Sequence, residues 1–250
     1  MQFHENINRD IIAVAGTWDP MLPRHIALFK ELIRYSRKKS LNPYIIIFYP
    51  NPVNHLLQNR HSEYFDLDAR MAYFKRLALN SVVVADLTKE DLKRPVADFF
   101  DELFKSTGVV LNELWAGENQ SLGGGPQGFG SLVKECSARN IKLRKLKNSF
   151  LVNLDKEAIY KHIKAGEFEA IAAMTGYYPT YKFKEDRRIN MHDGVYSAKL
   201  RTTPFDSSNE APVVVKIVDG CLQEIKKPVE YNWLILSERL DKPIPAEPGQ

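Results

Sequence analysis

The chain alternates between short apolar runs and longer amphipathic stretches over its first two-thirds. Continuous apolar runs at residues 11–15 and 44–48 predict buried strands, and the valine-rich residues 81–85 predict a third strand. Apolar residues at helical spacing predict a helix over residues 23–39, and Asp66 or Asp68 is expected to cap another that ends at Leu79. The same patterns then predict helices at 95–104 and 131–139 and strands at 109–116 and 141–146. Strands separated by helices indicate an α/β fold with a doubly wound parallel sheet.

The pattern changes after residue 155. Residues 156–163 and 167–174 are expected to form a helical pair, interrupted by Gly166 and closed by Gly176. Beyond it only short strand candidates follow, at residues 195–200, 213–218 and 231–236. We therefore predict two domains, residues 1–176 and a small antiparallel β-rich unit over residues 177–250.

Composition and charge exclude several classes of protein. A hydrophobic fraction of 44% with 26% charged residues is typical of a globular protein with a full core. The net charge of +4 is modest, and the basic clusters at residues 34–39 and 142–147 lack the interleaved aromatic residues that stack nucleobases. No apolar stretch has the roughly 20 residues of a membrane helix. We expect no nucleic acid and no membrane as partners.

The two cysteines and the N-terminus bear on localisation. Cys136 and Cys221 are far apart and lack metal-like spacing, so we expect buried free thiols in a reducing compartment. The first ten residues are polar and lack the apolar core of a signal peptide. Together these features predict a cytoplasmic protein.

The segment over residues 13–25 carries the most chemical information. A buried strand breaks at Gly16-Thr17, and the chain passes through Asp19 into a helix with Arg24 and His25 in its first turn. A glycine turn that leads into a helix presents free backbone N–H groups and the positive end of the helix dipole. This arrangement favours the binding of phosphate, although an ordinary βα loop without a ligand shows the same sequence pattern.

The amino-acid sequence of the segment resembles the nucleotide-binding motif of the bacterial bifunctional riboflavin kinase/FAD synthetases, a family of the HxGH nucleotidylyltransferase superfamily. The family motif reads G-T-F-D-G-V-H-x-G-H. Gly16, Thr17, Asp19 and His25 match it, whereas Leu22 stands at the first histidine and Arg24 at the glycine between the two histidines. The motif is therefore degenerate, and the chain is interpreted as a divergent member.

Further segments match the family in the same order along the chain. Asn51 lies in a segment similar to T-F-x-P-H-P, at the position of the histidine, and Arg70 stands at a lysine that opens a helix. Residues 116–128 resemble the loop V-G-x-D-F-R-F-G…G, with Gly117, Asn119, Gly123 and Gly128 at matching positions. Residues 159–167 and 176–179 resemble I-R-x-x-I-x-x-G-D and L-G-R-P-Y.

The resemblance implies a Rossmann-like sheet of the nucleotidylyltransferase type, followed by a reduced riboflavin kinase barrel, in which residues 193–196 resemble the G-V-Y strand. Two elements of the family are missing. The S-S-T-R segment, whose arginine helps to hold nucleotide phosphates, is replaced by residues 155–158, and the kinase motif G-x-P-T-A-N is absent. Riboflavin kinase activity is therefore not expected.

The resemblance also implies ATP, Mg²⁺ and FMN or FAD as ligands, with His25 and Arg24 as catalytic residues. The nucleotide-binding residues would be Gly16, Thr17, Asp19, Asn51, Gly117, Asn119, Gly123 and Gly128. Arg24 would replace the missing histidine, block the pocket or face solvent, and His25 would bind phosphate or cap its own helix. Asp19 would bond its own turn or help to place a metal, and the loop at Gly123 would admit a ribose or simply be flexible. The remaining histidines show no metal-ligand spacing.

Three functions follow from these features. The first is adenylyl transfer from ATP to FMN or a related phosphate, with release of pyrophosphate. The second is a protein that binds a nucleotide or flavin with little turnover, and the third is a structural or regulatory subunit with a protein partner. Gly16-Thr17 and the glycine loop favour the first two, whereas Leu22 and Ala158 favour the last two.

Overall fold

The structure is a computed structural model, and its described residues form two compact units. The described residues are 10–49, 64–86, 95–117, 128–146, 156–183, 189, 191–205, 207–223 and 230–241. The first unit contains those within Met1–Trp18, Arg24–Asn59 and Phe74–Val152, and the second those within Asp19–Pro23, Arg60–Tyr73 and Asn153–Gln250. The predicted domain boundary after residue 176 stays a prediction.

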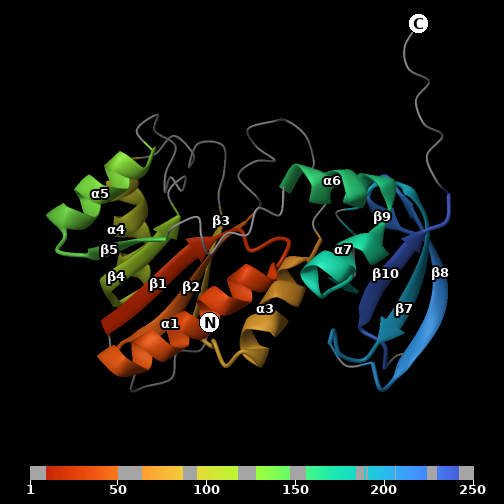
Figure 1. The fold of residues 1–250 in the computed structure, drawn as a ribbon, viewed down its shortest axis with the longest axis horizontal. Helices are drawn as coiled ribbons and strands as arrows, with labels where there is room; N and C mark the ends of the chain where they lie inside the picture. Colours follow the sequence, from red (N-terminus) through yellow and green to blue (C-terminus); the bar gives the residue numbers. More distant parts are fainter. Residues whose placement is uncertain are drawn as a thin grey trace, which may run out of the picture. The chain divides into compact units, whose positions relative to one another are not determined.

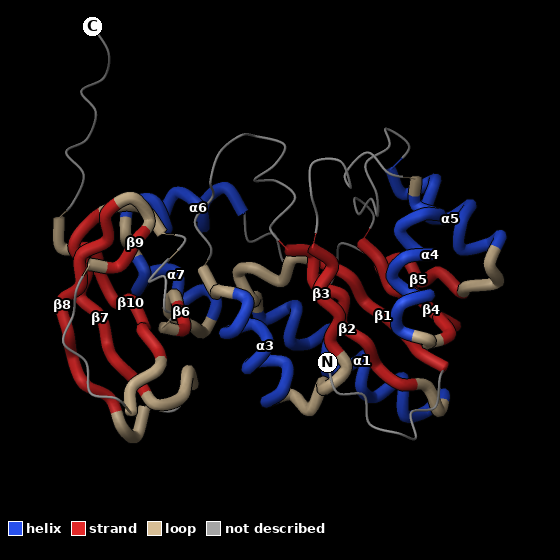
Figure 2. Tube along the Cα trace, turned by 180° about the vertical axis from the view of Figure 1, so that it is seen from behind, coloured by secondary structure: helices blue, strands red, loops and turns tan. Residues whose placement is uncertain are grey.

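The first unit is built on a five-stranded parallel sheet with the strand order β3-β2-β1-β4-β5. The strands are β1 (Asp10–Gly16), β2 (Asn42–Tyr49), β3 (Val82–Asp86), β4 (Val110–Gly117) and β5 (Lys142–Leu146). Helix α1 (Pro23–Lys39) covers one face, and α4 (Val96–Thr107) and α5 (Gly128–Ala138) cover the other (Figures 1 and 2). The predicted α/β fold with a doubly wound parallel sheet is confirmed.

Strand β1 shows why the apolar runs form this sheet. Residues 11–15 are all buried, because helices pack against both faces of the strand. Ile11, Ala13 and Ala15 belong to the core formed with α4 and α5. On α1, Leu28, Phe29 and Leu32 are buried at helical spacing, and three basic residues in the last turn complement the helix dipole.

The second unit combines two short helices with a curled antiparallel sheet of order β6-β10-β7-β8-β9 (Figure 1). The elements are α6 (Lys156–Ala165), α7 (Phe168–Thr175), β6 (Thr180–Lys182), β7 (Gly194–Arg201), β8 (Glu210–Val218), β9 (Cys221–Leu222) and β10 (Trp233–Arg239). The predicted helical pair and the three longer strands are confirmed. The sequence analysis missed β6 and β9, which are too short to show a pattern of their own.

Two glycines hold positive-φ positions around α7. Gly176 ends the helix at φ 85°, and its N–H donates to the Ala172 carbonyl at 2.7 Å, as a C-terminal glycine cap requires. Gly166 lies between α6 and α7 at φ 73°, and a Cβ there would lie 2.1 Å from Cβ of Arg239. A side chain at position 166 would therefore force the helical pair away from β10.

Helix α3 (Leu67–Arg76) is divided between the two units after Tyr73. It ends three residues before the predicted Leu79, since Ala78 adopts a left-handed backbone at φ 59°. Both cysteines are free, but only Cys136 is buried, whereas Cys221 is partly exposed, contrary to the expectation for the pair. None of the helices in the described ranges is long and apolar enough to cross a membrane.

Candidate functional site

The carboxyl ends of β1 and β4 bring several predicted residues to one edge of the sheet. The two strands are neighbours, with Val14 opposite Trp115, so that Gly16 and Gly117 end them on the same side. The strand order reverses between β1 and β4, and ligands of doubly wound sheets bind at this switch point. Among the described residues, no atom lies within 4 Å of the place that a Cβ on Gly117 would take.

Helix α1 begins beyond the same edge. Pro23 is its first residue, and Arg24 and His25 lie in the first turn, which contains no acidic residue. Gly16, Thr17, Arg24 and His25 are all partly exposed. Burial lowers the pKa of the Arg24 guanidinium from its usual value. Arginine is nevertheless a cation at neutral pH, because its ordinary pKa is so high. The dipole and the side chains therefore both favour an anion at this helix end.

Trp18, in the loop after β1, is the residue of this segment that the sequence analysis overlooked. Its backbone is left-handed at φ 54°, and its side chain is only 6% exposed. The indole Nε1 donates to the Ile46 carbonyl on β2 at 3.0 Å, and the ring lies 5.3 Å from the His25 imidazole. A large aromatic residue directly after a glycine turn was the available signal.

Asp19 belongs to the second unit and bonds far along the chain. Its Oδ2 accepts a hydrogen bond from the Tyr64 N–H at 3.0 Å, and its Oδ1 accepts one from the Phe65 N–H at 2.8 Å. Burial raises the pKa of this carboxyl above its usual range, while the charge of Arg70 and the two N–H donors oppose the rise. The expected bond to its own turn is replaced by this longer-range clamp.

Asp66 and Arg70 complete the polar interior beside this clamp. Asp66, one of the two predicted caps, accepts the Ala69 N–H at the start of α3 and the Lys182 N–H of β6, each at 2.7 Å. Arg70, in the first turn of α3, has no exposed surface, and its Nε donates to the Asp66 carbonyl at 3.4 Å. These residues tie α3 to β6 within the second unit.

The residues that replace the family histidine and glycine differ in their surroundings. Leu22 is 1% exposed, and Met21 before it is fully buried, so both are core residues. Arg24, in contrast, keeps part of its surface accessible. Of the other predicted site residues, Gly128 begins α5, whereas Asn51, Asn119 and Gly123 lie outside the described residues.

Comparison with known proteins supplies the family. The family model described as FAD synthetase matches residues 4–159, which is more than half of the chain. The chain belongs to the FAD synthetase family. The match includes the strand-to-helix crossover with Gly16, Thr17, Arg24 and His25 and extends as far as Ile159 in α6.

No curated protein matches the chain. The comparison with solved structures addresses the fold alone. A solved structure described as a macrolide-efflux protein from Streptococcus pneumoniae has a similar fold, with a TM-score of 0.63 at 12% sequence identity. That likeness covers 95% of this chain and 88% of the other.

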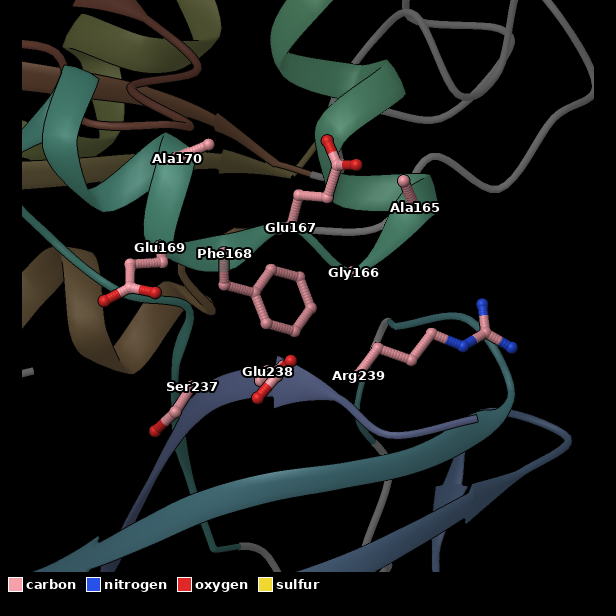
Figure 3. Close-up of a pocket in the computed structure, with 9 residues that line it drawn as sticks. All are labelled: Ala165, Gly166, Glu167, Phe168, Glu169, Ala170, Ser237, Glu238 and Arg239. Carbon is pink, nitrogen blue, oxygen red and sulfur yellow. The ribbon is translucent and has the colours of Figure 1, made fainter. Parts of the chain in front are cut away.

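A hollow of about 380 Å³ in the second unit lies outside the crossover of this FAD synthetase family member. It is bounded by the turn between α6 and α7 and by the end of β10, and its rim includes Glu167, Glu169 and Glu238 (Figure 3). Three carboxylates beside the single guanidinium of Arg239 disfavour a phosphate. The hollow is therefore a poor match for the nucleotide that the family uses.

Proposed function

We propose that this protein is an FAD synthetase-like nucleotidyltransferase that transfers the adenylyl group of ATP to FMN or a related phosphate. A phosphate oxygen of the acceptor forms a bond to the α-phosphorus of ATP, the bond from that phosphorus to the bridging oxygen breaks, and pyrophosphate leaves. The observation that carries the proposal is the switch point between β1 and β4, where the family's segment runs into a helix start that favours anions.

The proposed roles follow from the donors at this edge. His25 and Arg24 would donate hydrogen bonds to phosphate oxygens, and the main chain at Gly16 and Thr17 would approach the nucleotide closely. Arg24 would supply a second donor, a cationic one, since Leu22 cannot donate and is buried. A preorganised donor to the charge of the transition state typically contributes on the order of a hundred- to thousand-fold in rate.

Several predicted ligand contacts remain part of this proposal. We keep Gly117 and Gly128 as proposed ligand contacts, because Gly117 ends β4 and Gly128 begins α5. Asn51, Asn119 and Gly123 enter through the resemblance alone. For Asp19 we propose a structural role, since both of its carboxylate oxygens already accept N–H bonds. Riboflavin kinase activity is not part of the proposal, and a cytoplasmic location stays a prediction.

The described residues do not form a protein cage for Mg²⁺, which the family implies. They contain no group of three His, Cys, Asp or Glu side chains suited to a metal. Mg²⁺ commonly enters phosphate-transfer sites on the substrate phosphates, with several waters and few protein ligands. We therefore propose that it would arrive with ATP and would supply charge neutralisation there.

A second candidate function has one specific observation in its favour. Leu22 is buried at the position of the first family histidine, so one donor is lost from the motif. A protein with this change would keep a nucleotide or flavin pocket and have little turnover. This candidate function requires the same edge of the sheet and differs from the enzyme only in the rate of adenylyl transfer.

One experiment separates the two candidates. Purified protein with ATP, Mg²⁺ and FMN is assayed for pyrophosphate, and binding of ATP and of FMN is measured by calorimetry. We expect pyrophosphate release that falls about a hundred- to thousand-fold in His25→Ala. The matched control is His162→Ala, whose imidazole bonds Glu167 in the second unit and should leave the rate unchanged. Binding without pyrophosphate would establish the second candidate, and binding of neither ligand would overturn both.

A further inference from the structure

Trp18 is held in place from several sides within the first unit. Its backbone adopts a left-handed conformation that a residue other than glycine takes at a cost. Its indole fills the space where a Cβ on Gly16 would lie, at 2.9 Å, and its Nε1 donates to the Ile46 carbonyl in a buried bond of 3.0 Å. The ring therefore has one orientation, fixed relative to strand β2.

Two residues of α1 contact this ring. His25 and Phe29 lie one helical turn apart, and both meet the indole edge to face, with ring centroids 5.3 and 4.9 Å away and interplanar angles of 83° and 70°. Edge-to-face pairs at these distances are favourable because of the ring quadrupoles. Phe29 packs in turn on Phe74 at 5.1 Å, which anchors that side of the cluster.

We propose that Trp18 is a positioning residue that sets the direction of the His25 imidazole. The inference rests on the proposed function, in which His25 donates to a phosphate oxygen. The edge-to-face contact with the indole favours one orientation of the imidazole at the start of α1. The imidazole of His25 contacts the indole, and the indole is hydrogen-bonded to the Ile46 carbonyl on β2. Trp18 therefore fixes the imidazole relative to the sheet edge at which the nucleotide would lie.

The alternative is that Trp18 only fills the core. A core residue contributes to stability, and its replacement lowers the melting temperature without changing the imidazole of the folded protein. A positioning residue changes the imidazole itself, and the effect appears in kcat rather than in the binding of ATP. A misplacement of about 1 Å costs on the order of a hundredfold in rate.

The test uses two substitutions and a matched control in the full chain. Trp18→Leu keeps a smaller apolar side chain and removes the aromatic contact, whereas Trp18→Phe keeps an aromatic ring, although a smaller one, and removes the bond to Ile46. The control is Trp115→Phe, which also removes a buried Nε1 bond in the first unit, the one to Glu113 at 2.8 Å, and leaves the surroundings of His25 unchanged. Thermal melts first establish that each variant is folded.

The first measurement needs no catalysis. In the wild type, nuclear Overhauser effects should connect the indole of Trp18 with the imidazole of His25. Three-bond couplings measured on the His25 resonances should show one χ1 rotamer in the wild type and in Trp115→Phe, and an average over several rotamers in Trp18→Leu. The couplings are read instead of the chemical shifts, because loss of the indole ring current changes the shifts whether or not the imidazole moves. A single, unchanged χ1 rotamer of His25 in Trp18→Leu would overturn the inference, whether or not the protein turns over ATP.

The second measurement is kinetic. We expect kcat for pyrophosphate release to fall about ten- to a hundredfold in Trp18→Leu, with KM for ATP changed less than threefold, and to be partly restored in Trp18→Phe. A kcat in Trp18→Leu equal to that of Trp115→Phe would overturn the positioning role. A wild type without turnover overturns the proposed function instead, and the resonances of His25 then decide the inference alone.

Discussion

Each compact unit contains a buried carboxylate, and the two are satisfied in different ways. Glu113 on β4 of the first unit accepts hydrogen bonds from three side chains, Trp115 at 2.8 Å, Tyr35 at 3.0 Å and Lys142 at 3.2 Å. Asp19 in the second unit accepts from two main-chain N–H groups and lies in the field of Arg70. Side-chain donors hold Glu113, whereas the backbone holds Asp19.

The comparison of Glu113 with Asp19 teaches that burial of a carboxylate does not by itself indicate a catalytic role. In a nucleotide-binding family, a buried acid is a candidate for a general base or a metal ligand. However, the oxygens of both carboxylates already accept hydrogen bonds. The candidate site instead offers main-chain N–H groups and the side chains of Arg24 and His25. The chemistry that we propose for this site is therefore the stabilisation of negative charge, and we propose a structural role for both acids.

The largest effect is expected at Asp19. Asp19→Ala removes the acceptor of two buried N–H bonds, and hydrogen bonds to a charged group contribute about 1.5–3 kcal/mol each. We expect the free energy of unfolding to fall by about 3 kcal/mol or more in urea denaturation, and by less in Asp19→Asn, which keeps one acceptor oxygen. The exposed Asp98 of α4 provides the control, Asp98→Asn. Equal stabilities of Asp19→Ala and the control would contradict the clamp.

A smaller loss is expected at Glu113. Glu113→Gln keeps an acceptor oxygen for one donor and places an amide against the others, at a cost of about 2 kcal/mol in the free energy of unfolding. Lys142→Met should cost at most about 1 kcal/mol, because 65% of the lysine side chain is exposed. Urea denaturation of both variants measures the ratio, and a larger loss in Lys142→Met would show that the ion pair, not the neutral donors, holds Glu113.

The smallest effect is expected at a carboxylate that is not buried to the same degree. Glu210 on β8 pairs with Lys199 at 2.7 Å and Arg201 at 2.9 Å, and the hydrogen bond from Lys199 is the main cause that lowers its pKa. Its stabilisation is therefore present above the unfolded pKa and is lost as the pH falls through the folded one. Glu210→Gln should cost at most about 1 kcal/mol at pH 7.

The pH dependence of that last variant provides its own check. The difference in unfolding free energy between wild type and Glu210→Gln should close as the pH is lowered below 4.5, and it should shrink in high salt. A difference that stays constant with pH would mean that packing, and not charge, accounts for the loss.

The hydrophobic pattern of the sequence predicted those helices and strands that are long enough to show a helical or an extended periodicity. Five consecutive apolar residues in β1 and the helical spacing of Leu28, Phe29 and Leu32 identified the strand, the crossover and α1. They could not predict the partners of Asp19, which lie 45 and 46 residues away. Strand β6 was missed for the same reason, since its three residues are held by Phe65 and β10 rather than by any pattern in themselves.

The candidate site was predicted only in part. Gly16, Thr17, Arg24 and His25 were predicted from one segment and Gly117 from another, and the pairing of β1 with β4 brings Gly117 to the same edge of the sheet as Gly16. The sequence showed an aromatic residue directly after the glycine turn, but the contacts of Trp18 could not be predicted from it, because they depend on a left-handed backbone and on a carbonyl of β2. Both are tertiary features that a linear motif does not contain.

The close fit between Gly16 and Trp18 sets a rule for the evolution of this segment. Any side chain at position 16 would collide with an indole that is buried, hydrogen-bonded and unable to swing aside. A relative that replaces the glycine is therefore expected to carry a much smaller residue in place of the tryptophan, and the two changes should be inherited together.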